Sequence, residues 1–338
     1  MMKEAMLYQR LEKGEVRCYL CGHRCLIREG RQGICLVREN RGGTLYTLVY
    51  GRTISAHVDP IEKKPLFHFY PGTTAFSVAT VGCNFHCRFC QNADISQMVR
   101  DEHYIMGEEM SPAQIVALAQ EQRGQSIAYT YTEPTIFFEY AYDTAKLAHE
   151  AGIKNVFVTN GYMTPEALEL IQPYLDAANV DLKSFSDSFY RRIVGARLDL
   201  VLESLRLMKK LGIWLEITTL LIPTLNDSDD ELRQAAHFIA QELGIDTPWH
   251  ISRFSPAYKL TDKPSTPPRT LQRARQIGLE AGLRYVYEGN VPGSEGESTY
   301  CYNCKNPIIR RYGYFISEKH MQDSKCTFCG AKIDGVGL

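Results

Sequence analysis

The sequence predicts an α/β fold built on a parallel sheet, with a small cysteine-rich module at each end of the chain. From residue 73 to residue 293, short apolar runs typical of buried strands alternate with segments of helical periodicity. Such alternation favours a parallel sheet whose ligands gather at the carboxyl ends of its strands. The 11 cysteines fall into groups of four, three and four, and the two outer groups lie outside the alternating region.

The N-terminal unit is expected to span residues 1–72. Four of its cysteines lie close together in a Gly- and Arg-rich segment that is too small for a core of its own; they are Cys18, Cys21, Cys25 and Cys35. Four thiolates close a tetrahedral zinc site, and they also hold an iron–sulfur cluster. The spacing does not decide between the two, and we favour zinc. Residues 45–50 predict a short sheet, and the charges and three prolines of residues 59–72 predict a structured loop.

The core unit is expected to span residues 73–293. Strands are predicted over 74–81, 126–131, 155–159, 178–182, 214–222, 250–254 and 285–287. Helices are predicted over about 112–122, 135–151, from 165, 200–211, 227–243 and 269–281. The first helix begins at a capping box, Ser111 to Gln114, with Pro112 at its first position. A closed barrel and an open doubly wound sheet both satisfy these six strand–helix pairs.

The C-terminal unit is expected to span residues 294–338. Two Cys-x2-Cys pairs stand 21 residues apart there and make up the third cysteine group, Cys301, Cys304, Cys326 and Cys329. This form is typical of a zinc ribbon, with an iron–sulfur site as the alternative. Closely spaced cysteines in a chain with no evident secretory signal indicate metal binding rather than disulfides.

The central cysteine group follows directly on the first core strand. Cys83, Cys87 and Cys90 form a Cys-x3-Cys-x2-Cys triplet, and clustered thiolates bind iron or zinc. A four-iron cluster normally takes four cysteines, and this motif has no local fourth. One iron of such a cluster would therefore be open to a substrate or cofactor. The alternatives are a three-cysteine zinc or redox site, or buried thiols.

The triplet, with Phe89 just before its third cysteine, resembles the signature of the radical S-adenosylmethionine (SAM) superfamily. The resemblance implies a (βα)6 partial TIM barrel with a [4Fe-4S] cluster on the loop after its first strand. It also implies that SAM chelates the open iron. An electron from the cluster then splits SAM to methionine and a 5′-deoxyadenosyl radical, which abstracts hydrogen from a substrate.

Polar residues at the following strand ends resemble the SAM-binding runs of such enzymes. Glu133 stands where a Gly-Gly-Glu run binds the SAM amine, although Tyr131 and Thr132 replace the glycines. The runs that contain Thr159, Asn160, Asp181 and Lys183 resemble runs of pyruvate formate-lyase activating enzymes, and Lys183 is expected to pair with the SAM carboxylate. Those enzymes carry an acidic residue where this chain has Val158, which puts their cation site in doubt here. His250, Arg253 and Asn290 are further candidates on the same rim.

Four longer stretches narrow the resemblance, namely 59–69, 82–92, 131–135 and 285–293. With the two cysteine modules, they resemble the AmmeMemoRadiSam-system radical SAM enzymes, a branch related to pyruvate formate-lyase activating enzymes. This branch implies association with AMMECR-like and Memo-like proteins, and the chemistry implies a reductant such as flavodoxin or ferredoxin. No substrate follows from the resemblance.

Charge and hydropathy limit the possible functions. The net charge is −1, but residues 1–50 carry nine Lys or Arg against five Asp or Glu, and residues 301–338 carry six against three. Basic ends suit a polyanionic partner, but they also offset the charge of metal-bound thiolates, which we favour as the explanation. No apolar run approaches a membrane span, so a cytoplasmic protein is expected.

Three functions remain open. In the first, the radical abstracts hydrogen from RNA, a protein or a metabolite. In the second, it activates the backbone glycine of a glycyl radical enzyme. The basic ends and the lack of an inserted ferredoxin domain favour RNA or a metabolite slightly. A non-catalytic electron carrier or nucleic-acid binder is disfavoured, because the triplet lacks a fourth ligand and the chain is not basic overall.

Overall fold

The computed structural model describes residues 2–338. Its central sheet has eight strands in the order β16-β15-β14-β13-β12-β11-β9-β8. Every neighbouring pair from β9 to β16 is parallel, and only β8 runs antiparallel, along β9. The strands are β8 (Ser55–Pro60), β9 (Thr74–Ala79), β11 (Ser126–Tyr129), β12 (Lys154–Thr159), β13 (Ala177–Asp181), β14 (Trp214–Leu221), β15 (Trp249–Arg253) and β16 (Val286–Gly289). The predicted parallel α/β core is confirmed, and its two edge strands do not pair with each other.

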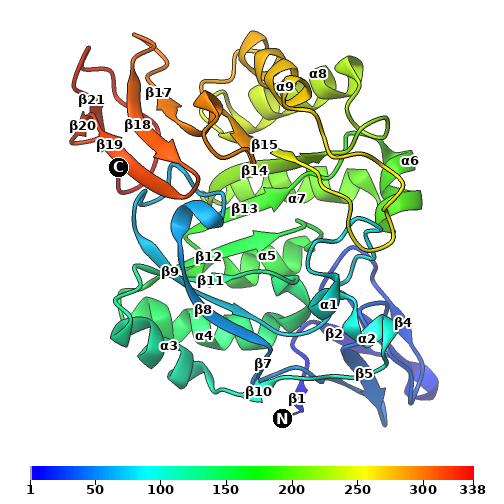
Figure 1. The fold of residues 1–338 in the computed structure, drawn as a ribbon. Coiled ribbons are helices and arrows are strands. Elements are labelled where there is room, and N and C mark those ends of the chain that lie inside the picture. Colours follow the sequence, from blue (N-terminus) through cyan, green and yellow to red (C-terminus); the bar gives the residue numbers. More distant parts are fainter. Residues whose placement is uncertain (1) are drawn as a thin grey trace.

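Helices pack around the outside of the sheet (Figure 1). They are α3 (Pro112–Glu121), α4 (Phe138–Glu150), α5 (Pro165–Ile171), α7 (Leu198–Lys210), α8 (Asp229–Phe238) and α9 (Pro268–Glu280). The capping box at α3 is formed, since Ser111 Oγ accepts from the Gln114 amide and Gln114 Oε1 accepts from the Ser111 amide at 2.8 Å. Three shorter helices, α1 (Ala93–Ser96), α2 (Met98–Asp101) and α6 (Asp187–Phe189), lie at the right of Figure 1.

Three elements differ from the sequence prediction. Strand β8 was not predicted, because its His57, Asp59 and Pro60 break the apolar alternation of a strand. Strand β11 stops at Tyr129, and the left-handed backbone of Tyr131 (φ 62°) turns the chain out of the sheet. In the N-terminal unit, strand β6 covers only Thr44–Thr47, and the chain turns before the end of the predicted run over 45–50.

The N-terminal unit consists of small antiparallel sheets. One contains β1 (Lys3–Glu4), β6 (Thr44–Thr47) and β5 (Arg38–Arg41), another β2 (Tyr8–Arg10), β3 (Val16–Cys18) and β4 (Leu26–Ile27), and a third pairs β7 (Arg52–Thr53) with β10 (Glu108–Glu109). A buried ion pair joins it to the core, where Arg38 donates to Glu139 of α4. The unit therefore packs directly on the core.

The C-terminal unit packs near the β16 end of the sheet, away from the N-terminal unit (Figure 1). It contains β17 (Thr299–Tyr300), β18 (Pro307–Tyr312), β19 (Phe315–Lys319), β20 (Met321–Gln322) and β21 (Lys325–Cys326). Its Ile308 and Ile333 share a buried apolar cluster with Phe67, Tyr285 and Tyr287. None of the helices in the described part of the chain is long and apolar enough to cross a membrane.

Candidate active site

A cavity of about 500 Å³ lies at the carboxyl ends of the parallel strands. Three cysteines and all seven residues predicted to contact SAM line it, namely Cys83, Cys87, Cys90, Phe89, Glu133, Thr159, Asn160, Asp181, Lys183 and His250. Asn290 lines it as well. Arg253 does not, and it donates to the Thr266 carbonyl instead, at 3.0 Å. Parallel strands bring their carboxyl ends to one edge, which explains why residues so far apart in sequence meet here.

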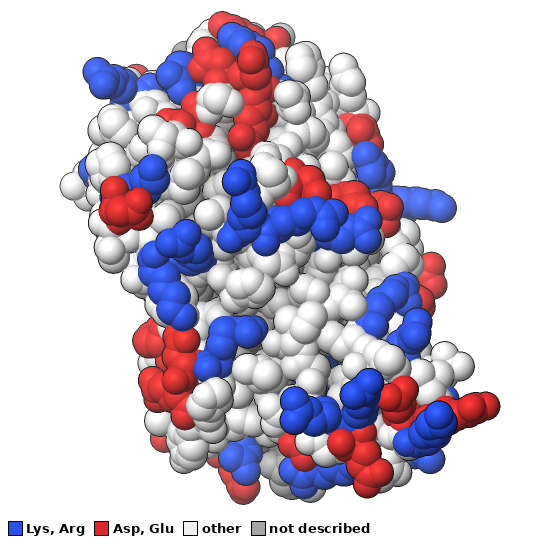
Figure 2. Space-filling model, turned by 90° about the vertical axis from the view of Figure 1, so that its right-hand side faces the viewer, with Lys and Arg blue, Asp and Glu red and all other residues white. Residues whose placement is uncertain are grey.

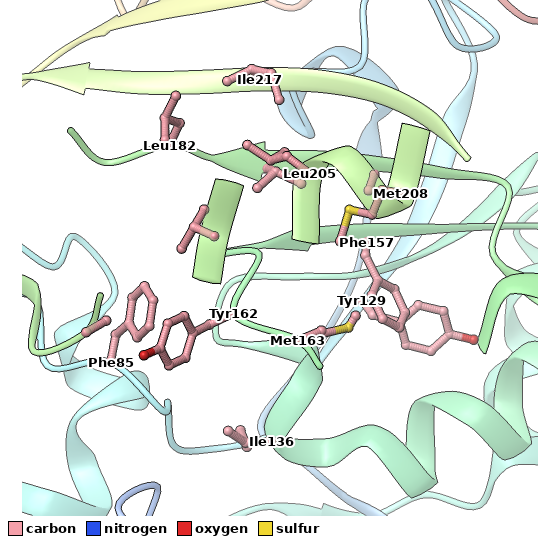
Figure 3. Close-up of a cluster of buried hydrophobic side chains, with 14 of the residues drawn as sticks. Phe85, Tyr129, Ile136, Phe157, Tyr162, Met163, Leu182, Leu205, Met208 and Ile217 are labelled. Carbon is pink, nitrogen blue, oxygen red and sulfur yellow. The ribbon is translucent and has the colours of Figure 1, made fainter. Parts of the chain in front are cut away.

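The cysteine loop is held by backbone contacts on both sides. The amides of His86 and Arg88 donate to the carbonyls of Val194 and Ile193, at 3.0 and 3.1 Å. The ring of Phe85 packs against that of Tyr162 (Figure 3), and their centroids are 5.1 Å apart. These contacts fix the loop, so the three thiols keep their places on the cavity wall.

The three thiols suit a cluster better than a single ion. The three sulfurs do not form one of the groups within 4.8 Å that tetrahedral zinc requires, as judged over the described residues. The described lining of the cavity contains no fourth cysteine. Burial raises the pKa of Cys87 to about 12, so its thiolate needs a bound cation. The Phe85 amide already donates to Cys83 Sγ at 3.3 Å, as donors do around iron–sulfur clusters. The donor set therefore fits a four-iron cluster with one open iron.

Glu133 ties the ends of two strands together. Its Oε1 accepts from the Thr135 amide and hydroxyl and from the Thr159 hydroxyl, while Oε2 accepts only from the Asn160 amide at 2.8 Å. Burial raises the pKa of this carboxyl, and the four donors limit the rise. Oε2 can still accept one more donor, which is the role expected toward an amine.

Asn160 joins the same strand end to the cysteine loop. Its Nδ2 donates to Asn84 Oδ1 at 2.7 Å, and its Oδ1 accepts from the Tyr162 amide at 3.1 Å. Asn84 Nδ2 is buried without a hydrogen-bond partner beside Cys83. A buried unpaired donor costs stability unless a ligand satisfies it, so this N–H is suited to a bound sulfur or oxygen.

Lys183 and Asp181 form an ion pair on the cavity wall, with Nζ and Oδ2 2.6 Å apart. Burial alone lowers the pKa of Lys183, but the charge of Asp181 outweighs it and leaves this pKa above its usual value. Lys183 therefore presents a permanent positive charge to the cavity, as pairing with a carboxylate requires.

His250 pairs with the buried carboxylate of Glu216. Its Nε2 lies 2.6 Å from Glu216 Oε2. Glu216 also accepts from the amides of Phe67 and His68 and from the Trp214 indole. The hydrogen bond to this well-anchored carboxylate fixes the orientation of His250, which lines the cavity.

The sequence did not point to some cavity residues. Lys64 lines the cavity, donates to Asp59 at 2.7 Å and lies 4.3 Å from the centre of the Tyr131 ring. Burial lowers the pKa of Lys64 to about 8, although Asp59 opposes the shift. Tyr314, from the hairpin between β18 and β19, also lines the cavity. For Lys64, the sequence offered only a pair of adjacent lysines in a proline-rich stretch. No feature of the sequence indicated that Tyr314 would reach the cavity.

Comparisons with known proteins agree with this geometry. The model of the Radical SAM superfamily matches residues 77–239. An uncharacterized protein of Methanocaldococcus jannaschii, MJ0808, is 49% identical over 335 residues, which cover 98% of this chain and 99% of that protein. The pyruvate formate-lyase-activating enzyme of Clostridium pasteurianum is 25% identical over 158 residues, covering 47% of this chain and 66% of the enzyme. A solved radical SAM methyltransferase from Sphaerobacter thermophilus, 16% identical, matches with a TM-score of 0.50 over 68% of this chain and 71% of that one, and shows a shared fold.

The segment over residues 77–239 therefore belongs to the radical SAM superfamily. Within it, the chain is homologous to pyruvate formate-lyase activating enzymes. Membership implies a [4Fe-4S] cluster and SAM, and the cavity has the residues to hold both. The predicted superfamily is confirmed, while the narrower AmmeMemoRadiSam branch stays a prediction.

Proposed function

We propose that the protein is a radical SAM enzyme that binds a [4Fe-4S] cluster through Cys83, Cys87 and Cys90. Bound together, the cluster and SAM would supply a 5′-deoxyadenosyl radical for hydrogen abstraction from a substrate. The observation that carries the proposal is the single cavity shared by the three thiols and by the polar strand-end residues.

Different residues of the cavity would bind different groups of SAM. Lys183, kept charged by Asp181, pairs with the carboxylate, and Glu133 Oε2 accepts from the amine. Thr159 and Asn160 hold Glu133 in place, while Phe89 supplies an apolar surface. His250, fixed by Glu216, donates or accepts at the far wall of the cavity.

The substrate we favour is an RNA or a metabolite. Lys63, Lys64 and Tyr314 line the cavity from the two flanking units and would contact a group with negative charge and a flat ring. Figure 2 shows the face at the right of Figure 1, on which charges of both signs surround a largely uncharged middle. Such a face lacks the broad basic surface of duplex binders, so a single exposed nucleotide or a small molecule fits better.

A second candidate is activation of a glycyl radical enzyme. Its support is the set of relatives, which includes a putative glycyl-radical enzyme activating enzyme of Methanocaldococcus jannaschii, 24% identical over 182 residues. It also includes a 4-hydroxyphenylacetate decarboxylase activating enzyme of Clostridium scatologenes, 26% identical over 161 residues.

The proposal extends to the setting of the enzyme. Flavodoxin or ferredoxin would supply the electron, and reduced cytoplasmic conditions would keep the thiols free. The stretches over 59–69 and 285–293 support the AmmeMemoRadiSam branch, with AMMECR-like and Memo-like proteins as partners. A zinc ion in the C-terminal unit completes the expected metal content, and its four sulfurs are close enough to hold one.

The decisive experiment is anaerobic reconstitution with iron and sulfide, followed by reduction in the presence of SAM. We expect 5′-deoxyadenosine and methionine in equal amounts. Absence of 5′-deoxyadenosine from protein that holds its four-iron cluster would overturn the proposal. Co-expression with a glycyl radical enzyme separates the two substrates, because a glycyl signal in electron paramagnetic resonance would favour the second candidate.

A further inference from the structure

The four N-terminal cysteines are arranged differently from the four at the C-terminus. In the C-terminal unit, Cys301 and Cys329 have sulfurs 3.6 Å apart, and Cys304 and Cys326 have sulfurs 3.7 Å apart. Zinc–sulfur bonds of 2.3 Å in a tetrahedron place sulfurs about 3.8 Å apart. Over residues 2–338, this C-terminal group is the one whose ligand atoms all lie within 4.8 Å.

The N-terminal thiols do not meet the spacing of a single ion. No three of them come within 4.8 Å of one another, and the described sulfur–sulfur contacts short enough for hydrogen bonding are the two in the C-terminal unit. A two-iron cluster also needs two thiolates at zinc-like distance on each iron. A four-iron cluster, in contrast, binds one thiolate on each iron and so holds its four thiolates further apart.

A small cavity lies among these thiols. Its lining includes Cys18, Cys21, Cys25 and Cys35, with apolar atoms of Leu20, Ile27 and Ile136 around them. Sulfurs drawn 2.3 Å from one zinc ion would leave no space for a water-sized sphere. The space between the four thiols therefore suits a larger group.

Arg38 supplies a charge and a free donor to the same cavity. Its side chain is only 2% exposed and lines the cavity, and Glu139 pairs with its terminal nitrogens. Its Nε is buried with no hydrogen-bond partner. Buried donors are rarely left unpaired, and donors to sulfur are common around iron–sulfur clusters. This N–H is available to donate to a sulfur atom of a bound group, and the guanidinium charge would partly offset that of four thiolates.

The N-terminal cysteines also lie next to the central triplet. His23, two residues after Cys21, has its Nε2 2.8 Å from the Asn84 carbonyl, and Asn84 follows Cys83. A Cβ on Gly82 would lie 3.7 Å from the Cys35 carbonyl. The chain segments that carry the two cysteine groups are thus in direct contact.

We propose that Cys18, Cys21, Cys25 and Cys35 bind a second [4Fe-4S] cluster, fully ligated by protein and adjacent to the cluster that binds SAM. This assignment takes the place of the zinc that the sequence alone favours. Unlike the central triplet, the site leaves no iron open, so it does not bind SAM.

The test uses the full chain with Cys83, Cys87 and Cys90 all changed to alanine, produced with iron and purified without oxygen. We expect about four irons, four sulfides and one zinc per chain, and a four-iron signal in electron paramagnetic resonance after reduction. About two zinc ions and no iron would overturn the proposal.

Two further measurements guard against misfolding and stray iron. Adding Cys18→Ser and Cys35→Ser to that variant should remove the iron and leave the zinc, whereas retained iron would overturn the proposal. The second measurement uses the wild-type chain. It should hold about eight irons, and its two reduced clusters should broaden each other's signals through magnetic coupling. A content of four irons with an unbroadened signal would also overturn it.

Discussion

The C-terminal cysteines and the central triplet share the Cys-x2-Cys spacing but differ in what surrounds them. The C-terminal sulfurs approach to 3.6 and 3.7 Å, and Cys329 is exposed to solvent. The triplet is spread along a cavity with Glu133, Asp181 and Lys183 on its walls. Similar spacing along the chain therefore predicts metal ligands in both regions, whereas the neighbouring side chains favour a structural role for one and a reactive role for the other.

Among the substitutions that test this difference, Cys87→Ala should cause the largest loss of activity. Loss of a triplet ligand removes the cluster that binds SAM, so formation of 5′-deoxyadenosine should fall more than about 100-fold. The zinc content and the unfolding temperature should change little. Product analysis with metal determination checks both, and Arg88→Ala, an exposed change in the same loop, is the control that should leave them intact.

Cys329→Ala should show the reverse pattern. Loss of a zinc ligand should remove the zinc and lower the unfolding temperature by about 5 °C or more, because structural metal binding is part of folding. Iron content and product formation per folded chain should stay within about threefold. Lys332→Ala is the matched surface control, and equal loss of the SAM-binding cluster in the Cys87 and Cys329 variants would refute the division between the two regions.

His68→Gln tests how the stability of the contact between the core and the C-terminal unit depends on pH. His68 Nδ1 donates to the Asp334 carbonyl and Nε2 accepts from the Tyr287 hydroxyl, both at 2.6 Å, so the ring is neutral. Burial lowers the pKa of His68 to about 4. The unfolded chain therefore takes up a proton between pH 6.5 and 4 that the folded chain does not. Stability should fall by up to about 3 kcal/mol as the pH drops through this window.

In the His68→Gln variant this part of the pH dependence should disappear. Denaturant titrations at pH 7 and pH 4.5 measure it, and the exposed His237→Gln is the control that should keep the wild-type slope. An unchanged slope in His68→Gln would show that another group governs the acid loss of stability.

Tyr314→Ala should have the smallest effect. Tyr314 reaches the cavity from the C-terminal unit but is 44% exposed. SAM cleavage in the absence of substrate should change less than twofold, and stability by less than about 0.5 kcal/mol. Phe315→Ala, one residue further along and outside the cavity, is the control. A tenfold slower cleavage in Tyr314→Ala alone would mean that the C-terminal unit forms part of the SAM site.

Much of the core could be predicted because its signals are local. Buried strands such as β12 and β14 are short runs rich in β-branched and apolar residues, and the α3 start is set by Ser111 and Pro112. The strand-end candidates could be predicted too, since parallel strands bring Glu133, Asn160 and Lys183 to one edge.

The rest depends on contacts between distant segments. Strand β8 carries no alternation of its own and forms only because β9 offers it an edge. Lys64 reaches the cavity because Asp59 and Tyr131, from different elements, hold it there. Glu216, an acidic residue in a buried strand, gave no hint that its partners would be His68 and His250.

Glu216 has a further consequence for how the chain can be divided. It is fully buried, and two of its four hydrogen-bond donors, the Phe67 and His68 amides, come from outside residues 73–293. A recombinant fragment cut at residue 73 would keep the whole parallel sheet and the His250 and Trp214 donors, but its buried carboxylate would lose two of its four hydrogen bonds. The fragment over residues 73–293 should thus be less stable than the full chain, whereas a fragment that begins before β8 keeps all four donors to Glu216.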